Sequence, residues 1–236
     1  MVKEELIKEI NRLKEEKNAL ILAHNYQIPE IQEVADILGD SLKLSIEAAK
    51  TDKDMIVFCG VKFMAESAKL LSPDKTVLLP NDDAGCPMAD MMTVKKLKEL
   101  KAKHPNVPVV TYVNSNTEIK AMSDVCCTSS SAVNIVEKLD ADKIIFGPDR
   151  NLGSYVQKFT DKEIILWDGF CPTHEAVTPE EVKEMRDKYP DAKIMVHPEA
   201  RPEVVKIADF VGSTSQMIDY ASKEGIEKYL VGTEKG

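Results

Sequence analysis

The chain repeats itself, and this internal repetition constrains its fold more than any other feature of the sequence. Residues 19–60, 107–147 and 192–232 align with one another along their whole length. Three columns of equivalent residues carry the alignment: His24, Tyr112 and His197 in the first, Ser41, Ser129 and Ser213 in the second, and Gly60, Gly147 and Gly232 in the third. A repeated sequence predicts repeated structural units, in which equivalent residues occupy equivalent places.

A second repeated segment carries a cysteine. The sequence KTVLLPNDDAGCP (75–87) matches KEIILWDGFCP (162–172), so Cys86 and Cys171 hold the same place in two copies, 85 residues apart. The third copy stops before this segment, and we expect the sequence to be truncated or to cover only part of its gene product. One further period predicts a third cysteine at about position 256.

Short apolar runs alternate with amphipathic segments along the chain, which predicts strands that alternate with helices. The expected opening helices are residues 3–17, 93–103 and 179–188, and the expected helices led by serine are 41–50, 130–138 and 214–223. The expected strands are 19–23, 55–58, 76–79, 108–113, 143–146, 163–167, 193–196 and 228–231.

Short apolar strands of this kind are typical of parallel sheets that are covered by helices on both faces. The predicted fold class is therefore α/β. We expect three homologous three-layer αβα sandwich domains around a pseudo-threefold axis, at residues 1–92, 93–177 and 178–236, with the third domain incomplete.

Composition narrows the function classes. The formal net charge of −9 argues against a nucleic-acid-binding surface. No apolar run reaches the ~18 residues that a membrane span needs. Residues 1–17 form a charged amphipathic segment rather than a secretory signal, which predicts a cytoplasmic protein. Five cysteines in such a chain do not predict a disulfide framework.

The first two columns predict a binding site for a small, multiply anionic molecule. His24, Tyr112 and His197 each follow an apolar run, and ligands of open parallel sheets bind beyond the carboxyl ends of the strands. The serines of the second column precede helices, where each can act as an N-cap. Together with hydroxyls such as that of Thr214, they also place three helix N-termini as candidate anion sites.

The matched cysteines predict a metal centre. A ring of three equivalent thiolates can ligate a [4Fe–4S] cluster and leave one iron open to substrate. Zinc held by three such cysteines is the competing interpretation. The remaining cysteines have no repeated partner and are interpreted as buried apolar residues: Cys59, Cys126 and Cys127.

A third set of residues lies two positions after the first column. Glu199 follows His197, Asn114 follows Tyr112, and Tyr26 follows His24 at this spacing. Glu199 is a candidate general base, because a desolvated site is expected to raise the pKa of a carboxyl group toward working pH. Tyr26 offers a hydroxyl group.

A series of short motifs resembles the quinolinate synthase A family in order along nearly the whole chain. The motifs are AHNYQ (23–27), GDS (39–41), DAGCPMADM (83–91), TYVNSN (111–116), CTSSSAV (127–133), FCPTH (170–174), VHPE (196–199), GSTSQM (212–217) and GTEKG (232–236). The resemblance implies condensation of iminoaspartate with dihydroxyacetone phosphate to quinolinate, in NAD biosynthesis. It also implies three α/β domains around a central [4Fe–4S] cluster, and a functional link to an enzyme that produces iminoaspartate.

Carried over by position, the resemblance implies that Cys86 and Cys171 are cluster ligands, with the third ligand beyond residue 236. Tyr26, Glu199 and His24 are the implied catalytic residues. The residues expected to bind substrate or product are His24, Ser41, Tyr112, Asn114, Ser129, His197, Glu199, Ser213 and Thr214.

Two alternatives remain from the residues alone. The first is a threefold anion-binding or sensor protein whose cysteines hold zinc structurally. The second is a folded fragment that carries no cluster and has no activity.

Overall fold

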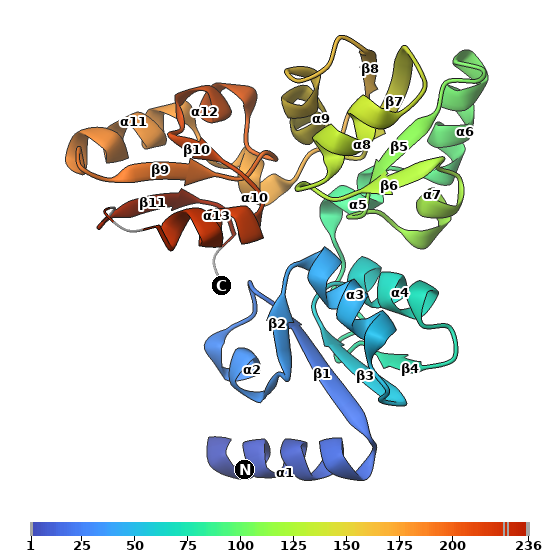
Figure 1. Ribbon diagram of the computed structural model, residues 1–236, viewed down its shortest axis with the longest axis vertical. Helices are drawn as coiled ribbons and strands as arrows, with labels where there is room; N and C mark the ends of the chain where they lie inside the picture. Colours follow the sequence, from blue (N-terminus) through green and yellow to red (C-terminus); the bar gives the residue numbers. More distant parts are fainter. Residues whose placement is uncertain (1, 224, 226, 235–236) are drawn as a thin grey trace. The chain divides into compact units, whose positions relative to one another are not determined.

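The computed structural model describes residues 2–223, 225 and 227–234, and Figure 1 labels its helices and strands. The chain divides into two compact units, at residues 1–86 and 87–234, and each is described by itself. Among the described residues, no helix is both long enough and apolar enough to cross a membrane.

The first unit contains one parallel sheet in the order β2-β1-β3-β4. Strand β1 lies at its centre, where Leu22 is opposite Ile37 of β2 on one side and Phe58 of β3 on the other. The elements are α1 (Lys3–Glu16), β1 (Ala19–His24), α2 (Pro29–Val34), β2 (Ile37–Gly39), α3 (Ser41–Lys50), β3 (Met55–Cys59), α4 (Lys62–Leu71) and β4 (Thr76–Leu78).

The second unit contains two parallel sheets. The first has the order β6-β5-β7-β8, which repeats the pattern of the first unit. Its elements are α5 (Pro87–Met91), α6 (Val94–Lys103), β5 (Val109–Tyr112), α7 (Thr117–Ala121), β6 (Val125–Cys127), α8 (Ala132–Lys138), β7 (Lys143–Gly147), α9 (Arg150–Gln157) and β8 (Glu163–Leu166).

The other sheet of this unit has the order β10-β9-β11, again with the first strand of the repeat at its centre. The other two sheets have a fourth strand, β4 or β8, beside the third strand of the repeat. Among the described residues, no strand pairs with β11 at the equivalent place. Its elements are α10 (Pro172–Glu175), α11 (Pro179–Lys188), β9 (Lys193–Val196), α12 (Pro202–Ile207), β10 (Phe210–Val211), α13 (Thr214–Ala221) and β11 (Tyr229–Gly232).

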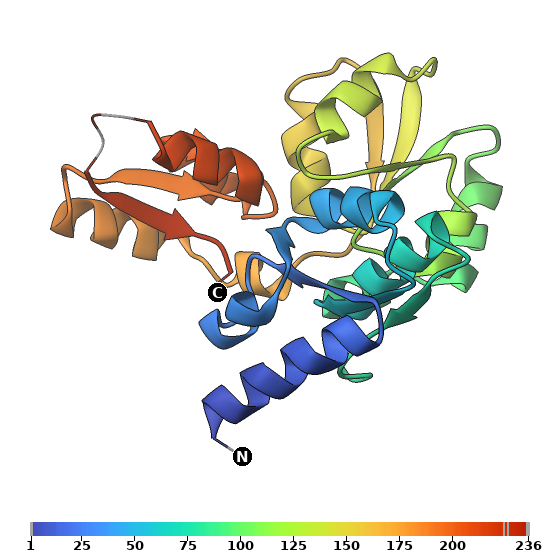
Figure 2. The ribbon, with the colours of Figure 1, turned by 60° about the horizontal axis from the view of Figure 1, so that its bottom comes forward.

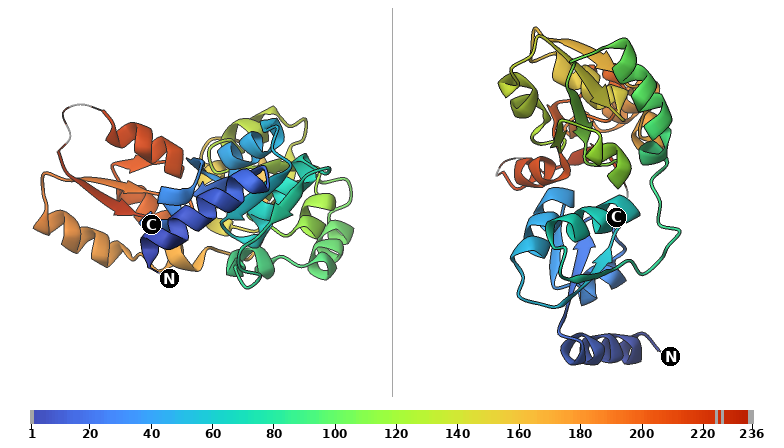
Figure 3. Two further views of the ribbon diagram at one scale, coloured as in Figure 1. Left: turned by 90° about the horizontal axis from the view of Figure 1, so that it is seen from below. Right: turned by 90° about the vertical axis from the view of Figure 1, so that its right-hand side faces the viewer.

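Helices cover both faces of the sheets. The opening helix of each repeat packs on the next helix, as in the pairs α1 with α2, α6 with α7 and α11 with α12. The later helices pair likewise, α3 with α4 and α8 with α9. Figures 2 and 3 show α11 and α13 on opposite faces of the β10-β9-β11 sheet. The predicted α/β class with parallel sheets is confirmed, whereas the three domain boundaries and the pseudo-threefold axis stay predictions.

Apolar side chains between the sheets and the opening helices form the cores. In the β5 repeat, the buried cluster contains Leu97 of α6, Val109 of β5, Ile145 of β7 and Trp167, which follows β8. In the β9 repeat, Val182 of α11 packs with the apolar side chains of β9 and α12. The helix residues lie on one apolar face of an amphipathic helix, and the strand residues belong to short apolar runs that are buried on both faces of the sheet.

An aspartate repeated in all three copies ties the first strand of each repeat to the second. The carboxylates of Asp36, Asp124 and Asp209 accept the backbone N–H of Ile21, Val109 and Ile194 at 2.8, 2.7 and 2.9 Å. Each aspartate also donates its own N–H to the carbonyl of that same residue. A cation from the opening helix lies beside each carboxylate: Lys14, Lys101 or Arg186. We call this arrangement the aspartate clamp.

The expected elements match the structure closely, and the segments after the two cysteines are the main difference. Short helices begin there at Pro87 and Pro172, and neither has a counterpart among the expected elements. Proline suits the first helical position, because its N–H would have no partner there and its φ angle is already close to the helical value.

Candidate active site

The first repeated column lies at the carboxyl ends of the central strands, as predicted. His24 ends β1, Tyr112 ends β5, and His197 directly follows β9. All three side chains are buried. The parallel direction of the strands places polar groups at one edge of each sheet, which is the usual ligand-binding edge of open α/β sheets.

The turns after β1 and β9 have the same hydrogen bonds. The backbone N–H of Tyr26 donates to His24 Nδ1, and that of Glu199 donates to His197 Nδ1, both at 3.3 Å. Because Nδ1 of His197 accepts a hydrogen bond, the proton of the neutral ring lies on Nε2, which donates to Ser129 Oγ at 3.2 Å. Burial and, to a lesser degree, neighbouring His174 lower the pKa of His197 to about 4 against the opposing charge of Glu199, so the ring is neutral at pH 7.

Glu199 is a buried acidic group at the centre of the site, with 2% of its surface exposed. Its Oε2 lies 2.9 Å from His174 Nδ1, and its Oε1 lies 3.7 Å from His197 Nδ1. The Tyr112 hydroxyl donates a hydrogen bond to the same carboxylate, while burial and this anionic partner raise the pKa of Tyr112. The carboxylate is therefore surrounded by proton donors.

The expectation of a raised pKa for Glu199 is wrong. Burial by itself raises the pKa of this carboxyl group. The charge that His197 carries in the acid range where Glu199 titrates, together with the contacts with His174 and Tyr112, outweighs burial and lowers the pKa. The expectation was based on the desolvation of the carboxyl group alone. The side chains that contact it in the folded chain cannot be identified from the sequence. Glu199 is accordingly ionised at neutral pH.

His174 is a site residue that the sequence analysis did not single out. It is 2% exposed, and its ring stacks on His197 with 4.8 Å between the centroids. Its Nε2 lies 2.9 Å from Thr233 Oγ1. Burial lowers the pKa of His174, but contacts with Cys171 and Glu199 outweigh it and raise the pKa to about 11. A signal was present in the sequence, since Pro172 begins a helix that places residues 171 and 174 on one face.

Cys171 joins this group at the start of α10. Its backbone N–H donates to Asp149 Oδ2 at 3.1 Å, and Asp149 also caps α9 through Leu152 N–H. Asp149 is fully buried, and burial together with the charge of Glu199 raises its pKa. Donor atoms of Cys171, His174 and Glu199 lie within 4.8 Å of one another, so these three side chains could share a metal ion.

Two buried polar atoms of the site lack a hydrogen-bond partner among the described residues: Asn114 Oδ1 and His174 Nδ1. The second atom contacts Glu199 Oε2 at 2.9 Å, but this contact is an ion pair without the alignment of a hydrogen bond. An unsatisfied buried polar atom costs free energy, and binding of a ligand that completes it recovers that cost.

The serine column behaves differently in each repeat. Ser213 is the N-cap of α13, as expected, and Thr214 is the first helical residue. Ser41 is instead the first residue of α3, because the carboxylate of Asp40 takes the cap position. Ser129 lies two residues before Ser131, the N-cap of α8, in a turn that is held by hydroxyl bonds of Thr128. The N-cap interpretation is wrong for Ser41 and Ser129.

In the first unit, His24 and Ser41 lie at the carboxyl ends of the neighbouring strands β1 and β2. The rings of His24 and Tyr26 lie 4.0 Å apart, and the Tyr26 hydroxyl lies 3.8 Å from Met64 Sδ. Ser41 begins α3, which follows β2. Cys86 is half-buried, directly before α5.

The interpretation of the other cysteines as buried apolar residues holds for Cys127 alone. Cys126 is exposed and Cys59 is half-buried. Strand β6 is an edge strand, so its alternating side chains place Cys127 in the core and Cys126 at the surface.

Comparisons with known proteins agree with the motif series. The family described as quinolinate synthetase A protein matches residues 8–236. A quinolinate synthase of Alkaliphilus metalliredigens (strain QYMF) is 63% identical over 232 residues, which cover 98% of this chain and 77% of that protein. The quinolinate synthase of Geobacter sp. (strain M21) is 59% identical, with 100% of this chain and 78% of that protein covered. The one from Caldicellulosiruptor bescii is 56% identical, with 99% and 77% covered.

Proposed function

Because the chain belongs to the quinolinate synthetase A protein family, we propose that the buried group around Glu199 is the catalytic part of its active site. The function of the chain is that of a quinolinate synthase, an enzyme of NAD biosynthesis. One observation carries the proposal for the site: the buried Glu199 carboxylate lies among His174, His197 and the Tyr112 hydroxyl, next to Cys171.

The proposed cofactor is a [4Fe–4S] cluster, with Cys86 and Cys171 as two of its three thiolate ligands. Cys171 fits this role because its thiol is buried and its backbone is held by Asp149. An additional group bound in the site would also explain why His174 Nδ1 lacks a hydrogen bond among the described residues. When bound, such a cluster supplies one iron that is open to substrate as a Lewis acid. The third thiolate is expected at about position 256.

The proposed substrates are iminoaspartate and dihydroxyacetone phosphate, whose carboxylates and phosphate need hydrogen-bond donors. His197, Ser129 and Tyr112 offer such donors beside Glu199. The other proposed substrate-binding residues are His24, Ser41, Asn114, Ser213 and Thr214. Because an imine hydrolyses readily in water, we also propose a functional link to the enzyme that produces iminoaspartate.

Glu199 is the proposed general base, with Tyr26 and His24 as further catalytic residues. The carboxylate is ionised, which is the form that a general base requires. Its lowered pKa by itself weakens it as a base, and a substrate that displaces one of its partners, His174, His197 or Tyr112, would raise that pKa. The neutral ring of His197 is fixed with its proton on Nε2, and it can therefore donate a hydrogen bond to a substrate oxygen in place of Ser129.

The test uses the complete protein, purified without oxygen and loaded with its cluster. Glu199→Gln should lower quinolinate formation by about 10²-fold or more, the usual scale for a positioned base. Its matched control is Glu203→Gln, a similar change at an exposed position of α12, which should keep the wild-type rate. A wild-type rate in Glu199→Gln would remove Glu199 from the mechanism.

A structural zinc site is the second candidate, because Cys171, His174 and Glu199 supply the mixed sulfur, nitrogen and oxygen donors that zinc accepts. Metal analysis of the anaerobic protein separates the two. About four iron and four sulfide per chain with broad visible absorbance support the cluster. About one zinc per chain in a colourless protein supports the alternative.

A further inference from the structure

A buried amide connects the proposed base to the neighbouring repeat of the second unit. Asn151, in the first turn of α9, is 4% exposed. Its Nδ2 donates to the backbone carbonyl of Glu199 at 3.0 Å and to Glu175 Oε2 at 2.8 Å. A carbonyl and an ionised carboxylate only accept hydrogen bonds, so both partners require the NH₂ group of the amide at this position.

The Glu199 carbonyl belongs to a turn with little support of its own. Strand β9 ends at Val196 and α12 begins at Pro202, and the turn between them is closed by a hydrogen bond from Ala200 N–H to the His197 carbonyl. Among the described residues, the hydrogen bond to the Glu199 carbonyl comes from Asn151. This bond fixes the peptide plane that follows Glu199, and hence the direction in which its side chain leaves the backbone.

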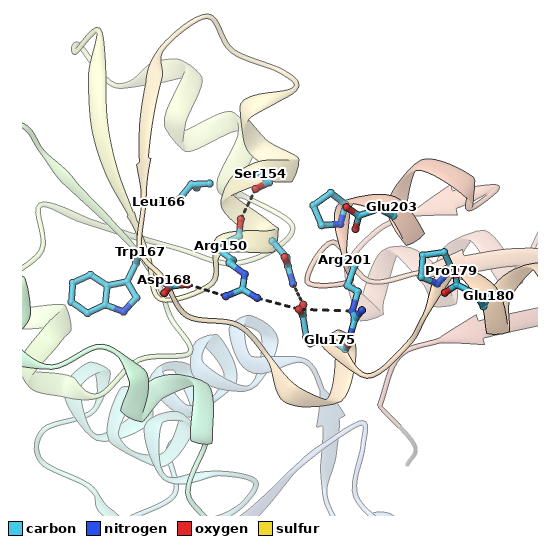
Figure 4. A pocket seen from close by; sticks show the side chains of 12 residues that line it. Arg150, Ser154, Leu166, Trp167, Asp168, Glu175, Pro179, Glu180, Arg201 and Glu203 are labelled. Atoms are coloured by element: carbon cyan, nitrogen blue, oxygen red, sulfur yellow. Dashed lines mark hydrogen bonds and ion pairs between the residues drawn. The ribbon is translucent and has the colours of Figure 1, made fainter.

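The other partner of Asn151 is itself held from two sides. Arg150 pairs with Glu175 at 3.1 Å and with Asp168 at 2.9 Å, while Arg201 Nε donates to the Glu175 carbonyl at 2.6 Å (Figure 4). These side chains line a cavity of about 610 Å³. The two arginines therefore fix Glu175, and Glu175 fixes the amide of Asn151.

We propose that Asn151 is a positioning residue for Glu199, with Glu175 as its anchor. This inference rests on the proposed role of Glu199 as the base. Asn151 is bonded to the Glu199 backbone and not to its carboxylate, so it acts on where the carboxylate points rather than on its charge. A general base must lie within hydrogen-bond reach of the proton it removes, and a small displacement costs rate.

The experiment is a double-mutant cycle on the cluster-loaded, complete enzyme. The variants are Asn151→Ser, Glu199→Gln, their combination, and Glu203→Gln as a control at the rim of the same cavity. Serine removes the amide that spans Glu175 and Glu199 while it leaves a small polar side chain. Quinolinate formation, the visible absorbance of the cluster and the thermal unfolding midpoint are measured for each variant.

We expect Asn151→Ser to lower turnover about tenfold, the effect of losing one hydrogen bond of ordinary strength. We expect it to keep the absorbance of the cluster and to shift the unfolding midpoint by only a few degrees. In the Glu199→Gln background the same change should lower turnover no further, because there is then no base to position. The Glu203→Gln control should behave as the wild type.

Three results would overturn the inference: wild-type turnover in Asn151→Ser, multiplying losses in the double variant, or loss of cluster absorbance together with a collapsed midpoint. The first two leave the role of Glu199 intact, whereas the third gives Asn151 a purely structural role. Wild-type turnover in Glu199→Gln contradicts the proposed function itself, so the two failures are distinguishable.

Discussion

Removing the carboxylate of one aspartate clamp should loosen the β9 strand locally. Asp209 Oδ2 accepts the Ile194 N–H at 2.9 Å and pairs with Arg186 at 3.2 Å. In Asp209→Ala, the buried Ile194 amide loses its acceptor, which costs about 1–3 kcal/mol. Loss of the partly exposed Arg186 pair adds about 0–1 kcal/mol, and Arg186 retains its bond to the Ile207 carbonyl. The two contributions together cost about 1–4 kcal/mol, and we expect a total of about 2 kcal/mol, because the partly exposed ion pair adds little.

Amide hydrogen exchange measures this effect where it arises. A loss of about 2 kcal/mol corresponds to about 30-fold faster exchange of the Ile194 amide, since about 1.4 kcal/mol is a factor of ten. Asp187→Ala, an exposed change on the same helix as Arg186, is the matched control and should leave this exchange rate unchanged. An unchanged Ile194 rate in Asp209→Ala, or an equal change in the control, would refute the clamp as a source of stability.

The contribution of Asp209 to stability should depend on pH. Burial raises the pKa of its carboxyl group, but the bonds to Ile194 and Arg186 outweigh burial and lower this pKa. The stability it contributes is therefore complete above the unfolded pKa of about 3.9 and is lost as the pH falls through the folded pKa, so urea unfolding should show wild type and Asp209→Ala converging in acid. Trp167→Ala should destabilise the second unit by about 3–5 kcal/mol in urea unfolding, because it removes a buried ring from the β5 core; a loss below about 1 kcal/mol contradicts that packing. Cys171→Ser should abolish the visible absorbance of the anaerobically purified, complete protein, and exposed Cys126→Ser should retain it; equal absorbance in both would remove Cys171 as a ligand.

The repeats made the fold readable from sequence. Apolar periodicity predicted α11 and β9 at their observed bounds, and α1 within one residue, because both faces of these strands and one face of these helices are buried. The helices after Cys86 and Cys171 were missed, although Pro87 and Pro172 mark their first positions. A short helix has no apolar period, and only its first residue signals it.

The site residues that belong to the repeated columns, or directly follow them, could be predicted from the sequence. Tyr112, His197 and Glu199 come together at the ends of strands, because equivalent strand ends of parallel sheets carry equivalent side chains. The clamp aspartates also follow the first column at a constant spacing of 12 residues, so a fuller alignment would have found them.

The rest of the site depends on contacts between residues that are far apart in the chain, which the sequence does not show. Asn151 and His174 contact Glu199 across 48 and 25 positions of the chain, and they have no counterpart in the repeated columns. The pKa of Glu199 was misjudged for the same reason, because its direction follows from the partners that tertiary structure supplies. Burial alone predicts the opposite sign.

The central claim is that this chain carries out quinolinate synthesis at the buried group around Glu199. The most direct test supplies the complete, cluster-loaded protein with iminoaspartate and dihydroxyacetone phosphate and measures quinolinate chromatographically, for the wild type and for Glu199→Gln. We expect quinolinate that depends on both substrates and falls by about 10²-fold or more in the variant. No quinolinate from a wild-type protein with an intact cluster, or equal amounts from both proteins, would contradict it.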